Sequence, residues 1–439
     1  MKLKIMEQNY KRQMILSQRG IYNLKFCVLF LLCLFFTVRP LSAVILLAFG
    51  IAFLDTTKIR IKRINNDRRY MILFGFWLYC FLISLAWETW NQSINLTMLY
   101  RISWIIILIR VVTMNKDYIS LIQTYKKIMI VCACFGIIEY LTKISTWSLL
   151  GLHVTGNLQY GAHRISVIFY NPLVYSAFLL IAFWSEWCYP CKQKILHYLM
   201  VGLFAVNMIL TEARSAWVAL VCGMVVFVLP RIKRIRLTAR KFLYGFFTVI
   251  VLAGVGYLCR ERLLALMEVI FLRLGSTSIR EGSYIQRTGV IKNAFDFFVH
   301  NSVYFLTGGG GYGYAGIFIR EHPVVLGFHA IDNQYIYYLL NYGVVGTALF
   351  LKATFWKSGY MLHHLGNINC RFSILCMMTI ACSYFFFDAM SWPSFFICYA
   401  LTWGAIIMRW QKIVIKIRMY RTSEKAEVIF SGWMRCFEL

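Results

Sequence analysis

Long apolar stretches separated by short polar segments run along nearly the whole chain. Runs of about 15–20 apolar residues recur, each long enough to cross or nearly cross a bilayer as a helix. We predict about twelve spans, at residues 24–38, 41–55, 70–87, 96–112, 128–142, 173–189, 196–211, 215–230, 242–258, 332–350, 372–387 and 395–409. Only Arg39–Pro40 separates the first two, so one long kinked helix is the alternative there. The pattern predicts an all-α integral membrane protein with a single polytopic domain, residues 1–439.

One polar segment interrupts this pattern between the ninth and tenth predicted spans. Residues 259–331 carry arginines and glycines, and no cysteine follows Cys259 in this segment. Apolar residues from Thr288 to Val299 follow helical spacing, so we expect this segment to be a large, partly helical loop outside the membrane.

The composition excludes an ordinary soluble protein. Of the 439 residues, 60% are hydrophobic and only 15% are charged, whereas a soluble domain has about 25% charged residues. A net charge of +28 would suggest nucleic acid as a partner of a soluble protein. In a membrane protein it is better explained by the enrichment of Lys and Arg in cytoplasmic segments, and we expect no nucleic-acid partner.

The distribution of Lys and Arg predicts the orientation of the chain. If the N-terminus is cytoplasmic, 33 of the 46 Lys and Arg residues fall in inside segments and 11 fall outside. The remaining two, Arg101 and Arg110, lie within a span, where Glu139 of the next span is a candidate partner for Arg101. This asymmetry favours both termini inside and the long loop outside.

Arginines stand at three of the outward positions. Arg214 lies in the very short turn ThrGluAlaArgSerAla (211–216) between two spans. A charge at this depth is costly and usually functional, although a snorkelling Arg paired with Glu212 is the alternative. Arg164 precedes Asn171–Pro172, which we expect to begin a helix; Arg164 could bind an anion.

The third position is the long loop itself. Arg280 and Arg287 flank GluGlySerTyrIleGln, and a glycine run follows at Gly308–Gly311. Such a run permits positive φ angles and a close approach of backbone N–H groups to a ligand, and a flexible hinge is the alternative.

A candidate base lies where the loop ends, in GlyPheHisAlaIleAspAsn (327–333). If the next helix begins one turn early, His329, Asp332 and Asn333 share one face. A His beside a carboxylate can serve as a base near neutral pH, so His329 is the preferred candidate base. Asp332 acting alone is the alternative, and a surface His without a catalytic role is another. No second close pair of ligands accompanies it, so we predict no metal site.

These features resemble the O-antigen ligase and polysaccharide polymerase superfamily of bacterial envelopes. The likeness rests on the twelve-span plan, the turn at 211–216, the large outer loop and AspAsnGlnTyrIleTyrTyrLeuLeuAsnTyrGlyValValGly (332–346). The region of about 196–350 carries most of it.

The resemblance implies a glycosyltransferase that needs no cofactor or metal. Outward arginines, here Arg214, Arg164 and Arg287, would bind the pyrophosphate of an undecaprenyl-linked glycan, and a loop residue would help an acceptor hydroxyl attack the anomeric carbon. Ligases typically place His directly before the Asn that opens the tenth span, where this chain has Asp332. That difference favours a repeat-unit polymerase over a ligase.

We therefore expect an enzyme of the bacterial cytoplasmic membrane that polymerises lipid-linked repeat units into a surface polysaccharide. A chain-length regulator and a flippase are its expected protein partners. A ligase that moves finished glycan to a lipid or protein acceptor is the first alternative. A transporter of lipid-linked glycan is the second, although it predicts charges spread along a central cavity.

The orientation can be tested by cysteine labelling. In a background without native cysteines, Cys residues introduced at Ser283 and Ser302 should react with a membrane-impermeant thiol reagent in intact cells or spheroplasts. Labelling that appears only after lysis would place the loop inside and overturn the predicted topology.

Overall fold

The computed structural model describes most of the hydrophobic part of the chain. It describes residues 68–91, 97–114, 118–149, 158–159, 162–232, 282–311, 313–325 and 330–403, together with several residues between 23 and 31. The predicted spans at 41–55 and 242–258 lie outside the described residues, as do Arg280 and His329.

Long helices make up most of the described chain. Their bounds are α3 (Arg68–Asn91), α4 (Thr97–Met114), α5 (Tyr118–Thr142), α7 (Pro172–Cys188), α8 (Lys194–Leu210), α9 (Arg214–Ile232), α15 (Gln334–Thr354) and α17 (Ile368–Phe386). Each coincides with a predicted span to within a few residues, apart from the start of α5. Shorter elements complete the described fold: α6 (Thr146–Leu149), η2 (Val167–Phe169), α12 (Gly282–His300), α13 (Ser302–Thr307), α14 (Tyr314–Glu321), α16 (Ser358–His363), η3 (Ala389–Ser391) and an antiparallel pair, β1 (Leu158–Gln159) and β2 (Ala162–His163).

Several helices have the length and apolar character of membrane spans. Among the described residues, Tyr118–Thr142, Gln334–His363 and Ile368–Phe386 are long and apolar enough to cross a bilayer, and four shorter apolar helices accompany them. Some of these helices also expose apolar stripes at helical spacing on the outside of the bundle. Examples are Met71, Phe74, Leu78, Leu82 and Leu85 of α3, and Val218, Val221, Val225 and Val228 of α9. Apolar faces both inside and outside are typical of a helix bundle in lipid.

The fifth predicted span begins too late. We predicted residues 128–142, but α5 starts at Tyr118. Its first turns look polar in the sequence, yet Tyr118 is fully buried and Lys126 is 6% exposed. The Lys126 ammonium lies 2.5 Å from the Glu186 carboxylate and donates to the Tyr189 carbonyl, and His197 Nδ1 contacts the same carboxylate at 2.9 Å. A buried charge is tolerated when it is paired, and this pairing extends the helix.

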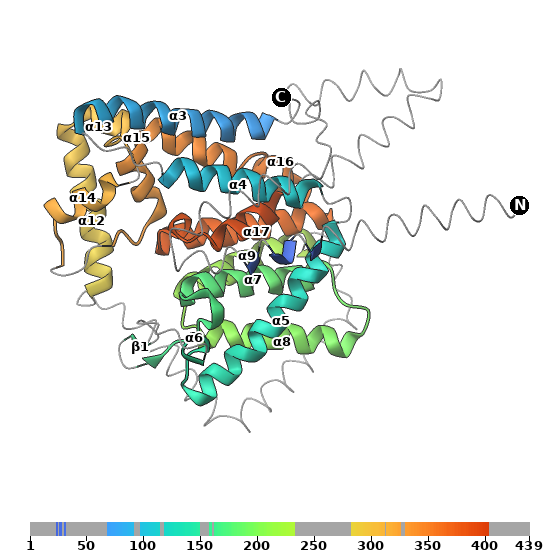
Figure 1. Ribbon diagram of the computed structural model, residues 1–439. Coiled ribbons are helices and arrows are strands. Elements are labelled where there is room, and N and C mark those ends of the chain that lie inside the picture. The colour runs from blue at the N-terminus through green and yellow to red at the C-terminus, as the bar shows by residue number, and fades with distance from the viewer. Residues whose placement is uncertain are drawn as a thin grey trace, which may run out of the picture.

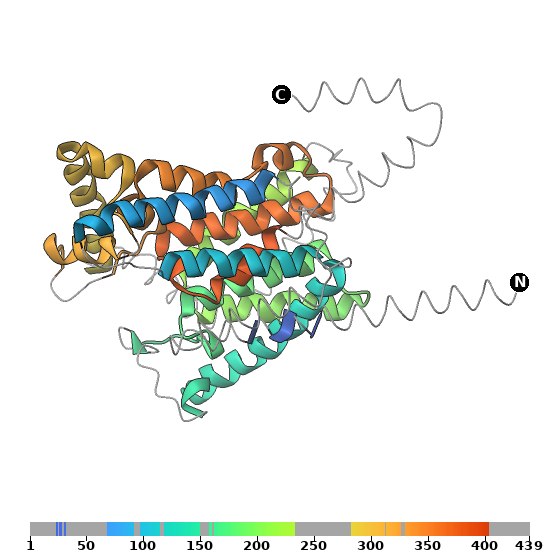
Figure 2. The ribbon, with the colours of Figure 1, turned by 45° about the horizontal axis from the view of Figure 1, so that its top comes forward.

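The short elements α12, α13 and α14 lie together at one end of the bundle (Figure 1). Figure 1 shows α3, α4, α9, α15 and α17 with roughly parallel axes and α12, α13 and α14 at one end of them. The view in Figure 2 agrees, and α6 and β1 lie toward this same end in Figure 1. We call this end, with α6, β1–β2, the α8–α9 turn and α12–α14, the loop end.

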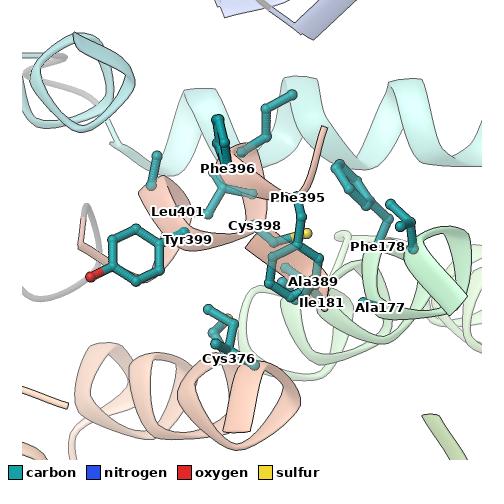
Figure 3. Packing of buried hydrophobic residues seen from close by; sticks show 14 of the residues in the cluster. Ala177, Phe178, Ile181, Cys376, Ala389, Phe395, Phe396, Cys398, Tyr399 and Leu401 are labelled. Carbon is teal, nitrogen blue, oxygen red and sulfur yellow. The ribbon is translucent and has the colours of Figure 1, made fainter. Parts of the chain in front are cut away.

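The centre of the bundle is the segment that follows η3. Residues 395–403 are helical and buried throughout. Figure 3 shows Ala177, Phe178 and Ile181 of α7 meeting Cys376 of α17 and side chains of this segment. The Tyr118 hydroxyl donates to the Leu401 carbonyl at 2.6 Å, which ties α5 to the same centre. A helix that is apolar on all sides occupies the core of a bundle.

A break in α15 anchors the loop helices. Gly343 has φ 64° and ψ −171°, so the helix is interrupted there. The N–H of Gly309 donates to the Leu340 carbonyl at 2.8 Å, and the Ala315 N–H donates to Asn341 Oδ1 at 2.9 Å. A Cβ at Gly343 would overlap the Leu306 carbonyl, and one at Gly308 would overlap the Tyr342 backbone nitrogen. The predicted close approach at the glycine run is therefore an approach to α15.

Replacing Gly343 should destabilise the fold. In Gly343→Ala, an L residue at φ 64° that also meets the backbone of Leu306 should lower the unfolding free energy by about 1–3 kcal/mol. Thermal unfolding of the purified protein in detergent measures this effect. The matched control is Gly202→Ala, where a Cβ meets nothing within 4 Å; equal melting temperatures for the two variants would contradict the prediction.

Candidate functional site

Two of the candidate arginines lie at the turn between α8 and α9. Arg164 Nε donates to the Thr211 carbonyl at 2.9 Å, and the Ile165 N–H reaches the Leu210 carbonyl at 3.5 Å. Arg214 begins α9 three residues after Thr211, and both arginines are half-buried. The structure thus places Arg164 beside the turn that carries Arg214, although the two are far apart in the sequence.

The backbone around these arginines is strained. Val167 has φ 49°, Tyr170 has φ 59° and Glu212 has φ 49°, all in the left-handed region that residues other than glycine rarely adopt. Each such residue costs roughly 1–3 kcal/mol and persists only where the surroundings fix it. Strain of this kind clusters at functional sites, which supports a binding role for this turn.

A buried carboxylate holds part of the strained segment. Glu139 of α5 is 1% exposed, and its two oxygens accept hydrogen bonds from the backbone N–H groups of Ser166 and Val167, each at 3.1 Å. Thr146 Oγ1 donates to the same side chain at 2.9 Å. Glu139 was a candidate partner for Arg101, but its described contacts organise the segment that follows Arg164.

The predicted helix start at Asn171–Pro172 is confirmed. Asn171 is the N-cap of α7, and its side-chain oxygen accepts from the Leu173 N–H at 2.8 Å. Pro172 occupies the first helical turn, where its missing N–H costs nothing.

The second group of candidate residues joins α12 to the start of α15. Arg287 Nη2 lies 3.3 Å from Asp332 Oδ2, and its guanidinium lies over the Phe386 ring of α17 at 5.8 Å. The neighbouring Gln286 is fully buried; it donates to the Ala330 carbonyl at 3.4 Å and accepts from the Val325 N–H at 3.2 Å. Two successive side chains of α12 therefore hold the chain that leads into α15.

The helix does not begin one turn early, so Asp332 and Asn333 do not share a helical face, and His329 lies outside the described residues. Asn333 is the N-cap of α15, with an extended backbone, and its side chain accepts from the N–H groups of Tyr335 and Ile336. Asp332 therefore precedes the helix instead of lying within it. An Asn side chain that accepts hydrogen bonds from the first N–H groups of a helix marks the point where the helix begins.

Asp332 lies in surroundings suited to proton transfer. Burial raises the pKa of its carboxyl, and the charge and hydrogen bond of Arg287 oppose that rise. A half-buried carboxylate held by one cation can accept a proton from a nearby hydroxyl.

Both groups lie at the loop end. Cys222 of α9 lies beside Cys382, near the C-terminal end of α17. From this contact the two antiparallel helices run on to Arg214 and to Phe386, the residue over which Arg287 lies. The arrangement thus brings arginines from three separate parts of the chain to one end of the bundle.

The described histidines of the loop have local structural contacts. His322 stacks on Phe318 with ring centroids 4.5 Å apart, and its Nδ1 lies 3.2 Å from the Phe318 carbonyl. His300 Nδ1 contacts the Asp296 carbonyl at 2.8 Å. Within the part of the chain that the structure describes, no three His, Cys, Asp or Glu side chains cluster in a way that could hold a metal ion.

Sequence reasoning missed two buried glutamines that organise the site. Gln286 continues the buried face of α12, which also holds Val290, Ala294 and Phe298 at a spacing of four residues. A polar residue at an apolar position of this spacing could have indicated its buried role. Gln334 is 1% exposed, and its Oε1 accepts from the Met390 N–H at 2.7 Å. Its role depends on a contact with a distant segment, which the local sequence does not reveal.

Comparison with known proteins identifies one family. A family model described as O-antigen ligase matches residues 199–351; no curated protein matches the chain. The matched segment includes Arg214, Arg287 and Asp332, whereas Arg164 precedes it. For residues 199–351, the match confirms the resemblance to the O-antigen ligase and polysaccharide polymerase superfamily.

Proposed function

We propose that this protein polymerises undecaprenyl-pyrophosphate-linked oligosaccharide units on the outer face of the bacterial cytoplasmic membrane. The main support is the gathering of Arg164, Arg214 and the Arg287–Asp332 pair at one end of a membrane helix bundle. The family match supports a role in membrane glycan processing. In this proposal the loop end faces outward, both termini are cytoplasmic, and residues 259–331 form the large outer loop of a single membrane domain.

The energetics of the outer face favour such a donor. No ATP or sugar nucleotide is present there to drive glycan synthesis, so the donor must carry its own activation. A lipid pyrophosphate does so, and its departure develops negative charge that cations must stabilise. Arginine suits this task because its planar guanidinium pairs with two phosphate oxygens and stays charged.

The proposed reaction forms one glycosidic bond and breaks one bond to phosphate. The acceptor hydroxyl gives its proton to Asp332, and its oxygen attacks the anomeric carbon of the donor glycan. The bond from that carbon to the phosphate oxygen breaks, and undecaprenyl pyrophosphate leaves with the electron pair. His329, three residues before Asp332, is the alternative base.

The arginines have separate proposed roles. Arg164 and Arg214 bind the pyrophosphate, since they border the strained turn. Arg287 orients Asp332 and offers its remaining donors to the donor phosphate. Arg280 is a further proposed phosphate ligand. Convergent arginines make a metal unnecessary for charge stabilisation.

A polymerase is preferred to a ligase because Asp332, rather than His, stands directly before Asn333. We propose a flippase that delivers the donor and a chain-length regulator as partners. A ligase would take the finished glycan to another acceptor, and a transporter would move the donor without chemistry.

Glycan analysis in a deletion strain tests the proposal. Loss of the protein should abolish long polymer while single repeat units remain on the carrier lipid at the outer face. Polymer that remains full-length on the carrier lipid would instead indicate a ligase. Units retained on the cytoplasmic side would indicate a transporter.

Arg214→Lys should lose most polymer-forming activity although the charge is kept. An ammonium cannot reproduce the paired hydrogen bonds of a guanidinium to pyrophosphate. Losing one charged hydrogen bond of about 1.5–3 kcal/mol corresponds to a decrease of about 10- to 100-fold. Polymer yield is measured in the complemented deletion strain.

The matched control is Arg320→Lys, an exposed residue of α14, which should form normal polymer. Near-normal polymer from a normally expressed Arg214→Lys protein would remove Arg214 from the pyrophosphate site.

A further inference from the structure

The segment after α17 is fixed against the start of α15 and against α4. Gln334 Oε1 accepts from the Met390 N–H at 2.7 Å, and Arg101 Nη1 donates to the Met390 carbonyl at 3.2 Å. Both backbone groups of Met390 are thus held by side chains from other helices. Asp388 lies two residues before Met390, and Asp332 lies two residues before Gln334. The contact therefore brings two acidic residues, from distant parts of the sequence, to one place at the loop end.

Asp388 has an environment of its own. Its carboxylate accepts a hydrogen bond from Ser391, and the described charges that act on it are those of Asp332 and Arg101. Behind Asp332 stands Arg287, 3.3 Å away. Arg287 therefore pairs with Asp332, while Arg101 is held at Met390, two residues after Asp388.

A buried hydrogen-bond donor faces this segment. Gln334 is 1% exposed, and among the described residues its Nε2 has no hydrogen-bond partner. Since Oε1 of the same amide accepts from Met390, Nε2 lies close to the same turn. A buried donor without a partner is rare in a folded protein and is often explained by a bound group or a functional role.

Two neighbouring carboxyls do not lose their protons independently. The pKa of Asp388 is raised to about 6, mainly by burial; the charge of Asp332 adds to this rise, and Ser391 and Arg101 oppose it. Asp332 therefore ionises first, and Asp388 follows as the pH passes about 6. Once Asp388 is charged, it repels the charge of Asp332, so Asp332 binds a proton more strongly and is a better base.

We propose that Asp388 is a positioning residue of the transfer reaction, which strengthens Asp332 as a base by placing a second negative charge beside it. This inference rests on the proposed function. Asp388 touches neither donor nor acceptor; the acceptor proton still goes to Asp332, and Arg101 and Gln334 keep the turn of Asp388 in place.

The test is a pH profile of the purified full-length protein in nanodiscs. The substrate is the lipid-linked unit that accumulates in the deletion strain. The wild-type rate should rise as the pH passes about 6. Asp388→Asn should lose this rise and reach a plateau roughly tenfold lower, well short of the 10²- to 10⁴-fold loss expected when the base itself is removed.

Three further variants make the result specific. Asp388→Glu keeps the charge and should retain the rise, whereas Asp332→Asn should abolish activity. His329→Ala should keep the rise near pH 6; its disappearance in this variant would assign the rise to the His329 imidazole and overturn the inference. An Asp388→Asn profile like that of the wild type would also overturn it, as would equal losses in Asp388→Asn and Asp388→Glu.

Failure of the proposed function gives a different result. If the wild-type protein does not join the units, or if Asp332→Asn is fully active, the proposed reaction or its base is wrong. If the wild type is active and Asp332→Asn is inactive, an unchanged Asp388→Asn profile removes only the role of Asp388.

Discussion

The interruption of α15 at Gly343 is the constraint on which the loop end depends. Within a bilayer an unpaired backbone group costs several kcal/mol, so a helix can break only where other groups replace its hydrogen bonds. The Gly309 N–H of the loop supplies such a bond to the Leu340 carbonyl, and the Ala315 N–H adds a bond to the Asn341 side chain. Because these contacts fix α13 and α14 on α15, they also fix α12, which carries the partner of Asp332. The position of the candidate base thus follows from the backbone of a broken helix.

The two groups of candidate residues are held in different ways. At the α8–α9 turn, Glu139 binds the N–H groups of a segment with left-handed residues, so the backbone near Arg164 is fixed before any ligand arrives. At the start of α15, side chains from α12 hold Asp332 and the residues before it. If these residues bind a phosphate as proposed, a site built this way needs little rearrangement, which is the condition for strong electrostatic stabilisation.

Most helices could be predicted from the sequence because an apolar run long enough to span a bilayer has few other structures available to it. The start of α5 could not, since Lys126 is buried only because Glu186 of another helix pairs with it. The arginines could be chosen from their place in turns and the loop. The sequence did not predict the cap at Asn333, which competes with a helix that starts one turn earlier. Nor did it predict the Arg287–Asp332 pair or the turn of Asp388, because these depend on contacts between segments that are distant in sequence.

The buried ion pair between α5 and α7 has a consequence for how the chain enters the membrane. Lys126 and Glu186 are both shielded from solvent in the folded bundle, and a lone charge costs up to about 3 kcal/mol when a helix inserts, depending on its depth. The two residues belong to helices separated by the segment that carries Arg164. Insertion of α5 is therefore most favourable when α7 is already synthesised, so that Glu186 can neutralise the charge of Lys126. The translocation machinery would then release these helices into lipid together rather than singly.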